Sequence, residues 1–284
     1  MGLGWHEWPL MLFTVLGQCA VGGFIVMGLS LLCSKTDEAQ RKSVHKGMFF
    51  IWVLLGIGFL LSMMHLGTIA RAMNSLNRVG ESALSNEIAC GIAFFALGGF
   101  YWLLAMMGKM PAALGKLWLI VAMIAGVVFI YAMSRVYQID TVPTWHSGYT
   151  TLSFFMTALV GGPLLGSLLK GRQCTCSGKA LAAVSVMALI VSAAFGMMQS
   201  AELSSMSSSV TSVAVMVPNY ASLMALRVAL VAIGLALWIY PMVRGQQPGT
   251  ASMLLGFIVV VGGEVIGRAV FYNLHMTVGM TFGG

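Results

Sequence analysis

Eight apolar runs dominate this sequence, and each is close to the ~20 residues that a helix needs to cross a bilayer. The connections between the runs are too short to hold a soluble domain. The sequence therefore predicts an all-α polytopic membrane protein, a bundle of eight transmembrane helices that forms one integral-membrane domain over residues 1–284. The expected spans are 10–32, 46–67, 86–108, 114–135, 150–170, 179–200, 222–243 and 251–274.

The composition excludes several other classes of protein. Hydrophobic residues make up 59% of the chain and charged residues only 8%, whereas soluble domains are about 25% charged. The net charge of +7 does not indicate nucleic-acid binding, because the basic residues cluster in the connections, as topology signals do. Among five cysteines only Cys174 and Cys176 are close in sequence, so we expect no iron–sulfur cluster or metal site in this chain.

The distribution of basic residues predicts the orientation. The odd-numbered connections hold ten Lys and Arg residues, and the opposite side holds three, Arg71, Arg78 and Arg135. Cytoplasmic connections carry the excess of positive charge. We therefore expect the odd-numbered connections to lie in the cytoplasm and both termini to face outward.

The richest polar stretch runs from Ser62 to Glu87, between the second and third apolar runs. With ~1.5 Å of helical rise per residue, His65 and Glu87 both fall at the outer edge of the bilayer. A lipid-soluble quinol would present its polar ring there. His65 and Glu87 could each accept one of the two protons that quinol oxidation releases, and Arg71 and Asn74 could bind the ring oxygens. The alternative is that His65 is only an interfacial residue.

Three further charged residues lie inside predicted spans, namely Arg227, Glu264 and Arg268. Glu264 and Arg268 share a helix face at i, i+4, and Arg227 lies at a similar depth. We expect a structural ionic group between the last two helices, with a place in the quinol site as the alternative. Haem would need two histidines at matching depth on facing helices. His65 and His275 both lie near the outer edge, but no second histidine lies deeper, so the sequence disfavours haem.

The inner half of the predicted bilayer contains almost no ionisable side chain, so acid–base chemistry is expected at one side only. This distribution disfavours a transporter, which needs relays or broken helices at mid-membrane.

Two surface features are also predicted. Trp145 is expected to be an interfacial anchor. Residues 201–221 are expected to include a short amphipathic helix on the outer surface or against a partner, from Met206, Val210, Val213 and Val217.

Several motifs resemble one family, the membrane-anchor (DmsC-type) subunits of dimethyl sulfoxide reductase-type molybdoenzymes. The resemblance runs nearly end to end and departs from the family pattern beside His65, where Thr68 and Ile69 follow HLG. The motifs are GWHEWPL, MMHLG, RAMNSLNRVG, SALSNEIA, IDTVPTW, GGPLL, VPNYASL, GGEVIGR and FYNLHMTVGM.

The resemblance implies a function in anaerobic respiration, in a bacterial inner membrane with both termini in the periplasm. It implies that the chain oxidises menaquinol and passes electrons to a four-cluster, ferredoxin-like iron–sulfur subunit, which supplies a periplasmic molybdopterin catalytic subunit. The family's quinol-site histidine and glutamate fall on His65 and Glu87. The resemblance implies no haem, iron–sulfur cluster or molybdopterin in this chain. The alternative is a purely structural anchor that has no quinol site of its own.

Overall fold

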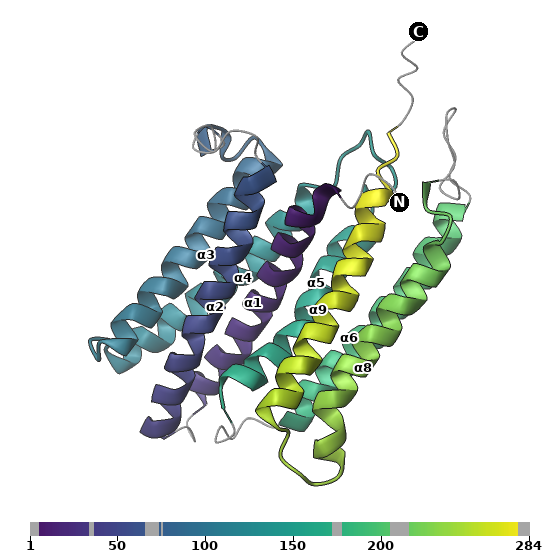
Figure 1. The fold of residues 1–284 in the computed structure, drawn as a ribbon. Helices are drawn as coiled ribbons and strands as arrows, with labels where there is room; N and C mark the ends of the chain where they lie inside the picture. The colour runs from purple at the N-terminus through teal and green to yellow at the C-terminus, as the bar shows by residue number, and fades with distance from the viewer. Residues whose placement is uncertain are drawn as a thin grey trace.

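The computed structural model describes residues 6–33, 37–65, 74, 76–171, 178–204 and 216–277. In these residues it is all-helical, and eight helices are long and apolar enough to cross a membrane, as predicted. Helices that are consecutive in sequence run in alternating directions (Figure 1). The helices are α1 (Trp8–Leu32), α2 (Glu38–His65), α3 (Ala83–Met106), α4 (Ala112–Arg135), α5 (Gly148–Leu169), α6 (Gly178–Ser204), α8 (Tyr220–Val243) and α9 (Thr250–Asn273).

The bundle has two polar ends. We call the end where α1 begins the upper end, as drawn in Figure 1, and the opposite end the lower end. α3, α5 and α8 also begin at the upper end, where α2, α4, α6 and α9 finish. That the upper end faces the periplasm stays a prediction.

α2 begins eight residues earlier than the sequence predicted. Its first turn is polar but well capped: the Asp37 carboxylate accepts a hydrogen bond from the Gln40 backbone N–H (2.7 Å), and the Gln40 side chain accepts one from the Asp37 N–H (3.3 Å). A helix of 28 residues is about 42 Å long, which exceeds a ~30 Å hydrocarbon core. The apolar pattern marked only the part of α2 that needs to be in lipid, and the capped turns extend beyond it.

α1 is the central helix and packs against α2, α4, α5 and α9. Its closest approach is to α5, where glycine backbones meet. A Cβ atom on Gly22 would lie 2.4 Å from the carbonyl oxygen of Ala158 and 2.9 Å from the Cα atom of Gly162. Small residues allow this contact in lipid, where close van der Waals packing drives helix association.

Aromatic side chains fill the space among α1, α2, α3 and α4. Phe94 of α3 lies between Phe24 of α1 (5.5 Å between ring centroids) and Phe129 of α4 (6.3 Å). Phe94 is fully buried, so its helix face points into the bundle. Glu87 and Tyr101 lie seven residues before and after Phe94 and therefore share this inward face.

Enlarging Gly162 should disrupt the bundle. Gly162→Leu places a side chain against the Gly22 backbone, and overpacking of this kind costs about 1–3 kcal/mol or more. We expect less assembled membrane protein and a lower melting temperature in detergent. Gly99→Leu is the matched control, because no atom of the described residues lies within 4 Å of a Cβ atom placed there. Equal yields for the two variants would contradict the glycine contact.

Candidate functional site

The structure brings two of the predicted quinol-site positions to the upper end. His65 is the last residue of α2, and Glu87 lies in the second turn of α3. Asn74 is exposed. The side chain of His65 and all of Arg71 lie outside the described residues, so no contact between them and Glu87 is assigned.

Glu87 is buried, although it lies near a helix end. Its side chain is 5% exposed, and its Oε1 atom has no hydrogen-bond partner among the described residues. A buried carboxylate oxygen without a partner is costly. It is also an acceptor that a bound hydroxyl group could use. The burial of Glu87 and its available acceptor oxygen are together the main geometric reason to treat the start of α3 as a candidate site.

Two tyrosines that the sequence patterns did not single out lie near Glu87. The hydroxyl oxygens of Tyr137 and Tyr272 are 2.5 Å apart, and both side chains are buried. Burial raises the pKa of Tyr137 well above its usual value, and the neighbouring Tyr272 and Glu87 raise it further. Tyrosine hydroxyls are protonated at neutral pH, so either of the two can donate the hydrogen bond between them. No local motif could have paired these residues, because they lie 135 positions apart.

The connection between α4 and α5 fixes the upper end of α9. The indole of Trp145 donates a hydrogen bond to the Phe271 carbonyl oxygen (2.7 Å), and the two rings stack at 5.2 Å. Thr144 donates a hydrogen bond to the Leu274 carbonyl oxygen. The prediction that Trp145 is an interfacial anchor is wrong, because its side chain is buried. Its N–H finds a partner inside the protein instead of in the headgroup region.

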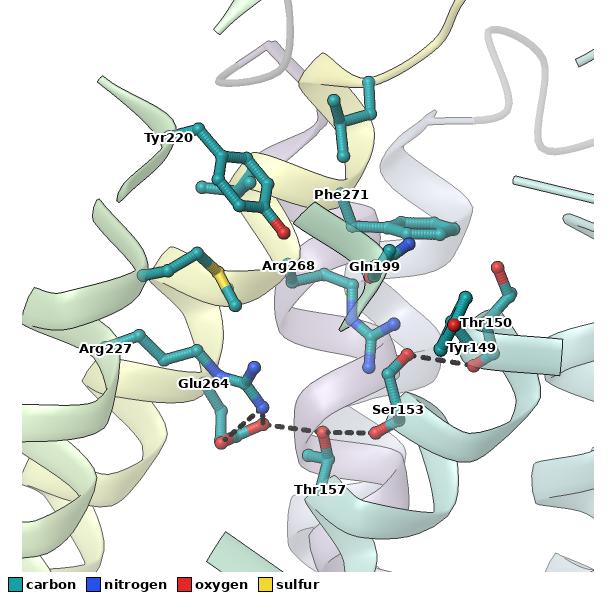
Figure 2. Close-up of a pocket in the computed structure, with 14 residues that line it drawn as sticks. Tyr149, Thr150, Ser153, Thr157, Gln199, Tyr220, Arg227, Glu264, Arg268 and Phe271 are labelled. Carbon is teal, nitrogen blue, oxygen red and sulfur yellow. Dashed lines mark hydrogen bonds and ion pairs between the residues drawn. The ribbon is translucent and has the colours of Figure 1, made fainter. Parts of the chain in front are cut away.

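A buried ion pair joins α8 to α9 (Figure 2). Nη2 of Arg227 lies 3.2 Å from Oε1 and 3.3 Å from Oε2 of Glu264. Thr157 of α5 donates to Glu264 Oε2 (2.6 Å), and Arg227 also donates to the Ser192 hydroxyl of α6 (3.0 Å). The pair thus connects four helices. Thr157 and Ser192 were not selected from the sequence, since single hydroxyl residues in apolar spans carry no distinctive spacing.

Arg268 was predicted in the same group but makes different contacts. Its Nη2 atom donates to Gln18 Oε1 of α1 (3.0 Å). Its guanidinium lies 3.8 Å from the centroid of the Phe154 ring. A cation over an aromatic face is stabilised by the ring quadrupole. The structure therefore separates Arg268 from the Arg227–Glu264 ion pair.

A small cavity lies beside these charges (Figure 2). Its volume of about 50 Å³ is enough for a few water molecules but far below the ~300 Å³ of a small-ligand pocket. Residues lining it include Tyr149, Gln199, Tyr220, Arg227, Glu264 and Arg268. A cavity of this size cannot hold a quinol ring, which favours a structural role for Glu264.

The described residues contain no group of three or more His, Cys, Asp or Glu side chains that could hold a metal ion. Cys19, Cys33 and Cys90 are free thiols. Cys174 and Cys176 lie outside the described residues, as do Met206, Val210 and Val213 of the predicted amphipathic helix. Val217 lies just before α8 and is buried, in a small cluster that includes Leu203 and Leu274.

The fold and these contacts define an integral membrane protein of eight spanning helices, with buried polar groups toward one end. The family described as DMSO reductase anchor subunit (DmsC) matches residues 1–274, and the chain belongs to this family. The chain is 53% identical over 285 residues to the YnfH chain of the anaerobic dimethyl sulfoxide reductase of Escherichia coli (strain K12), and the match covers both sequences completely. It is 54% identical to the C subunit of that organism's anaerobic dimethyl sulfoxide reductase, over 99% of both sequences. It is 43% identical to the corresponding C subunit of Haemophilus influenzae (strain ATCC 51907 / DSM 11121 / KW20 / Rd), again over both full lengths.

Glu264→Gln should reduce assembly more than activity per assembled molecule. Removing one partner of a buried pair leaves the Arg227 charge uncompensated, at a cost of about 3–5 kcal/mol in soluble proteins. The measurements are the amount of membrane-bound protein and the quinol-dependent activity per molecule. Thr157→Val is the milder control, since it removes one hydrogen bond to the same carboxylate. Normal protein levels with a collapsed quinol affinity would instead place Glu264 in the quinol site.

Proposed function

We propose that this chain is the membrane anchor of a dimethyl sulfoxide reductase-type molybdoenzyme complex, and that it oxidises menaquinol at its upper end. One menaquinol gives menaquinone, two protons and two electrons. The electrons pass to a four-cluster, ferredoxin-like iron–sulfur subunit and then to a molybdopterin catalytic subunit. The upper end faces the periplasm, and the protein resides in the bacterial inner membrane. The names of the relatives and of the family support the assignment to such a complex.

The observation that carries the quinol site is the buried Glu87 carboxylate, one of whose oxygens has no hydrogen-bond partner among the described residues. It lies at the helix end where headgroups replace hydrocarbon, which is where a quinol ring would rest. Oε1 can accept a hydrogen bond from a quinol hydroxyl and then its proton. His65, at the adjacent end of α2, is the acceptor for the other proton.

The buried charges also favour chemistry at one side of the membrane. Four of the buried charged side chains in the described residues, Glu87, Arg227, Glu264 and Arg268, lie in the upper part of their helices, and a fifth, Lys170, lies at the lower end of α5. His45 is an ionisable residue near the lower end. It lies inside α2, although the sequence predicted that it belongs to the connection before this helix. Within the described residues no charged side chain links His45 to the upper group through the middle of the bundle. Protons released from quinol should therefore leave at the upper end.

His65→Ala should abolish quinol-dependent reduction of the terminal acceptor while the complex stays in the membrane. Dyes that reduce the soluble subunits directly should still support turnover, because the anchor is bypassed. His146→Ala is the matched control, since His146 lies at the same end but is half exposed and contacts Asp140 (3.1 Å). Normal anaerobic growth of the His65→Ala strain would favour the alternative of a purely structural anchor.

Glu87→Gln should slow quinol turnover at least tenfold and change its dependence on pH. The amide keeps the size of the side chain but cannot take up a proton, so one proton-accepting step is lost. The measurement is the pH–rate profile for quinol oxidation by the complex in membranes. Glu81→Gln is the control, because Glu81 is exposed at the same end and pairs with Arg78. If the Glu87→Gln profile matches the parent's, Glu87 takes no part in proton transfer.

A further inference from the structure

A second, larger cavity lies at the lower end of the bundle, on the side opposite the proposed quinol site. Its volume is about 540 Å³, within the usual range of ligand pockets. It lies where α1 ends, α2 begins, α3 ends and α4 begins. Nothing in the proposed function uses this cavity.

The cavity is positively charged. Among the described residues, Arg41, Lys42 and Lys116 line it, and Glu38 is the one carboxylate that does so. Three cations and one anion leave two net positive charges. Glu38 pairs with Lys42 at 3.1 Å, in a contact that is largely exposed to solvent. Among the described residues, Lys116 has no ion-pair partner.

Hydrogen bonds hold several side chains that line the inner part of the cavity. Nε2 of His45 lies 3.2 Å from the Tyr101 hydroxyl, and the Trp102 indole donates to the His45 carbonyl oxygen (2.8 Å). Arg41 uses Nη2 to donate to the Leu31 carbonyl oxygen (2.9 Å), which holds its guanidinium across the end of α1. The polar groups are therefore held in position by the protein itself.

The remaining wall is apolar. Leu31, Leu32, Ala105, Met110 and Leu119 line the cavity beside the charged groups. A wall of this kind suits a ligand that has a hydrocarbon part as well as an anionic part. A neutral quinol would gain little from three cations, whereas a phosphate would pair with them directly.

We propose that this lower cavity binds a phosphate group, held by Arg41, Lys42 and Lys116, with His45 and Tyr101 as further polar contacts. The phosphate can come from the headgroup of an anionic phospholipid or from a soluble phosphate. The apolar wall and the place of the cavity at the helix ends favour the lipid. This site is separate from the quinol site, and its presence or absence does not affect that proposal.

The test uses the purified, delipidated complex in detergent. Its melting temperature is measured against increasing phosphatidylglycerol, phosphatidylcholine with the same acyl chains, or inorganic phosphate. Saturable stabilisation by phosphatidylglycerol alone supports a lipid headgroup. Saturable stabilisation by inorganic phosphate supports the site with a soluble ligand. Equal responses to phosphatidylglycerol and phosphatidylcholine, with no response to phosphate, would overturn the proposal.

Two variants connect any stabilisation to this cavity. Lys42→Gln and Lys116→Gln change exposed side chains, so the fold should persist. Each should weaken the apparent affinity for the phosphate ligand roughly fivefold, the effect expected for one cation near a membrane surface. Lys109→Gln is the matched control, because Lys109 is exposed at the same end but does not line the cavity. If a protein that carries both Lys42→Gln and Lys116→Gln binds the phosphate ligand as tightly as the Lys109→Gln protein, the cavity is not the site.

Discussion

The close approach of α1 and α5 at Gly22 and Gly162 determines where the buried polar groups can meet. Gln18 lies one turn before Gly22 on α1, and Thr157 lies just before the contact on α5. Because the two backbones touch, these side chains reach α9, where Gln18 accepts a hydrogen bond from Arg268 and Thr157 donates one to Glu264. Lipid offers no hydrogen bonds to a charged group, so the packing of small residues is what makes the ionic contacts possible.

The two buried carboxylates differ in their partners, and this difference separates their roles. Glu264 is paired with Arg227 and Thr157, and the cavity beside it holds only a few waters. Glu87 has an oxygen without a partner among the described residues, although Tyr137 and Tyr272 lie close enough to interact with it electrostatically. A carboxylate with both oxygens bonded, such as Glu264, stabilises helix packing, whereas an acceptor without a partner at a membrane edge is suited to a ligand.

Hydropathy alone predicted the eight spanning helices, because each run of apolar residues has to cover the same thickness of lipid. It could not predict the start of α2, where the Asp37–Gln40 cap sustains a helix through polar residues. Spacing placed Arg268 on the same face as Glu264, but only the packing of α1 and α5 shows that Gln18 and Phe154 are nearer partners. Trp145 looked interfacial by type, yet its burial depends on a connection that folds over α9. The Tyr137–Tyr272 pair joins distant segments, which no single-sequence pattern encodes.

One inward face of α3 connects the two proposed sites. Glu87, Phe94 and Tyr101 are spaced by seven residues, so about 21 Å of helix separates the carboxylate at the upper end from the tyrosine at the lower end. Phe94 lies between them in an aromatic cluster that keeps the middle of the bundle apolar.

The cations at the lower end have a second explanation, as signals that set the orientation of the chain in the membrane. Lys109 and Lys116 count equally in that signal, however, and only Lys116 lines the cavity beside His45 and Tyr101. The orientation of the chain in the membrane requires basic residues on one side, but it does not require that they line a cavity whose polar groups are hydrogen-bonded.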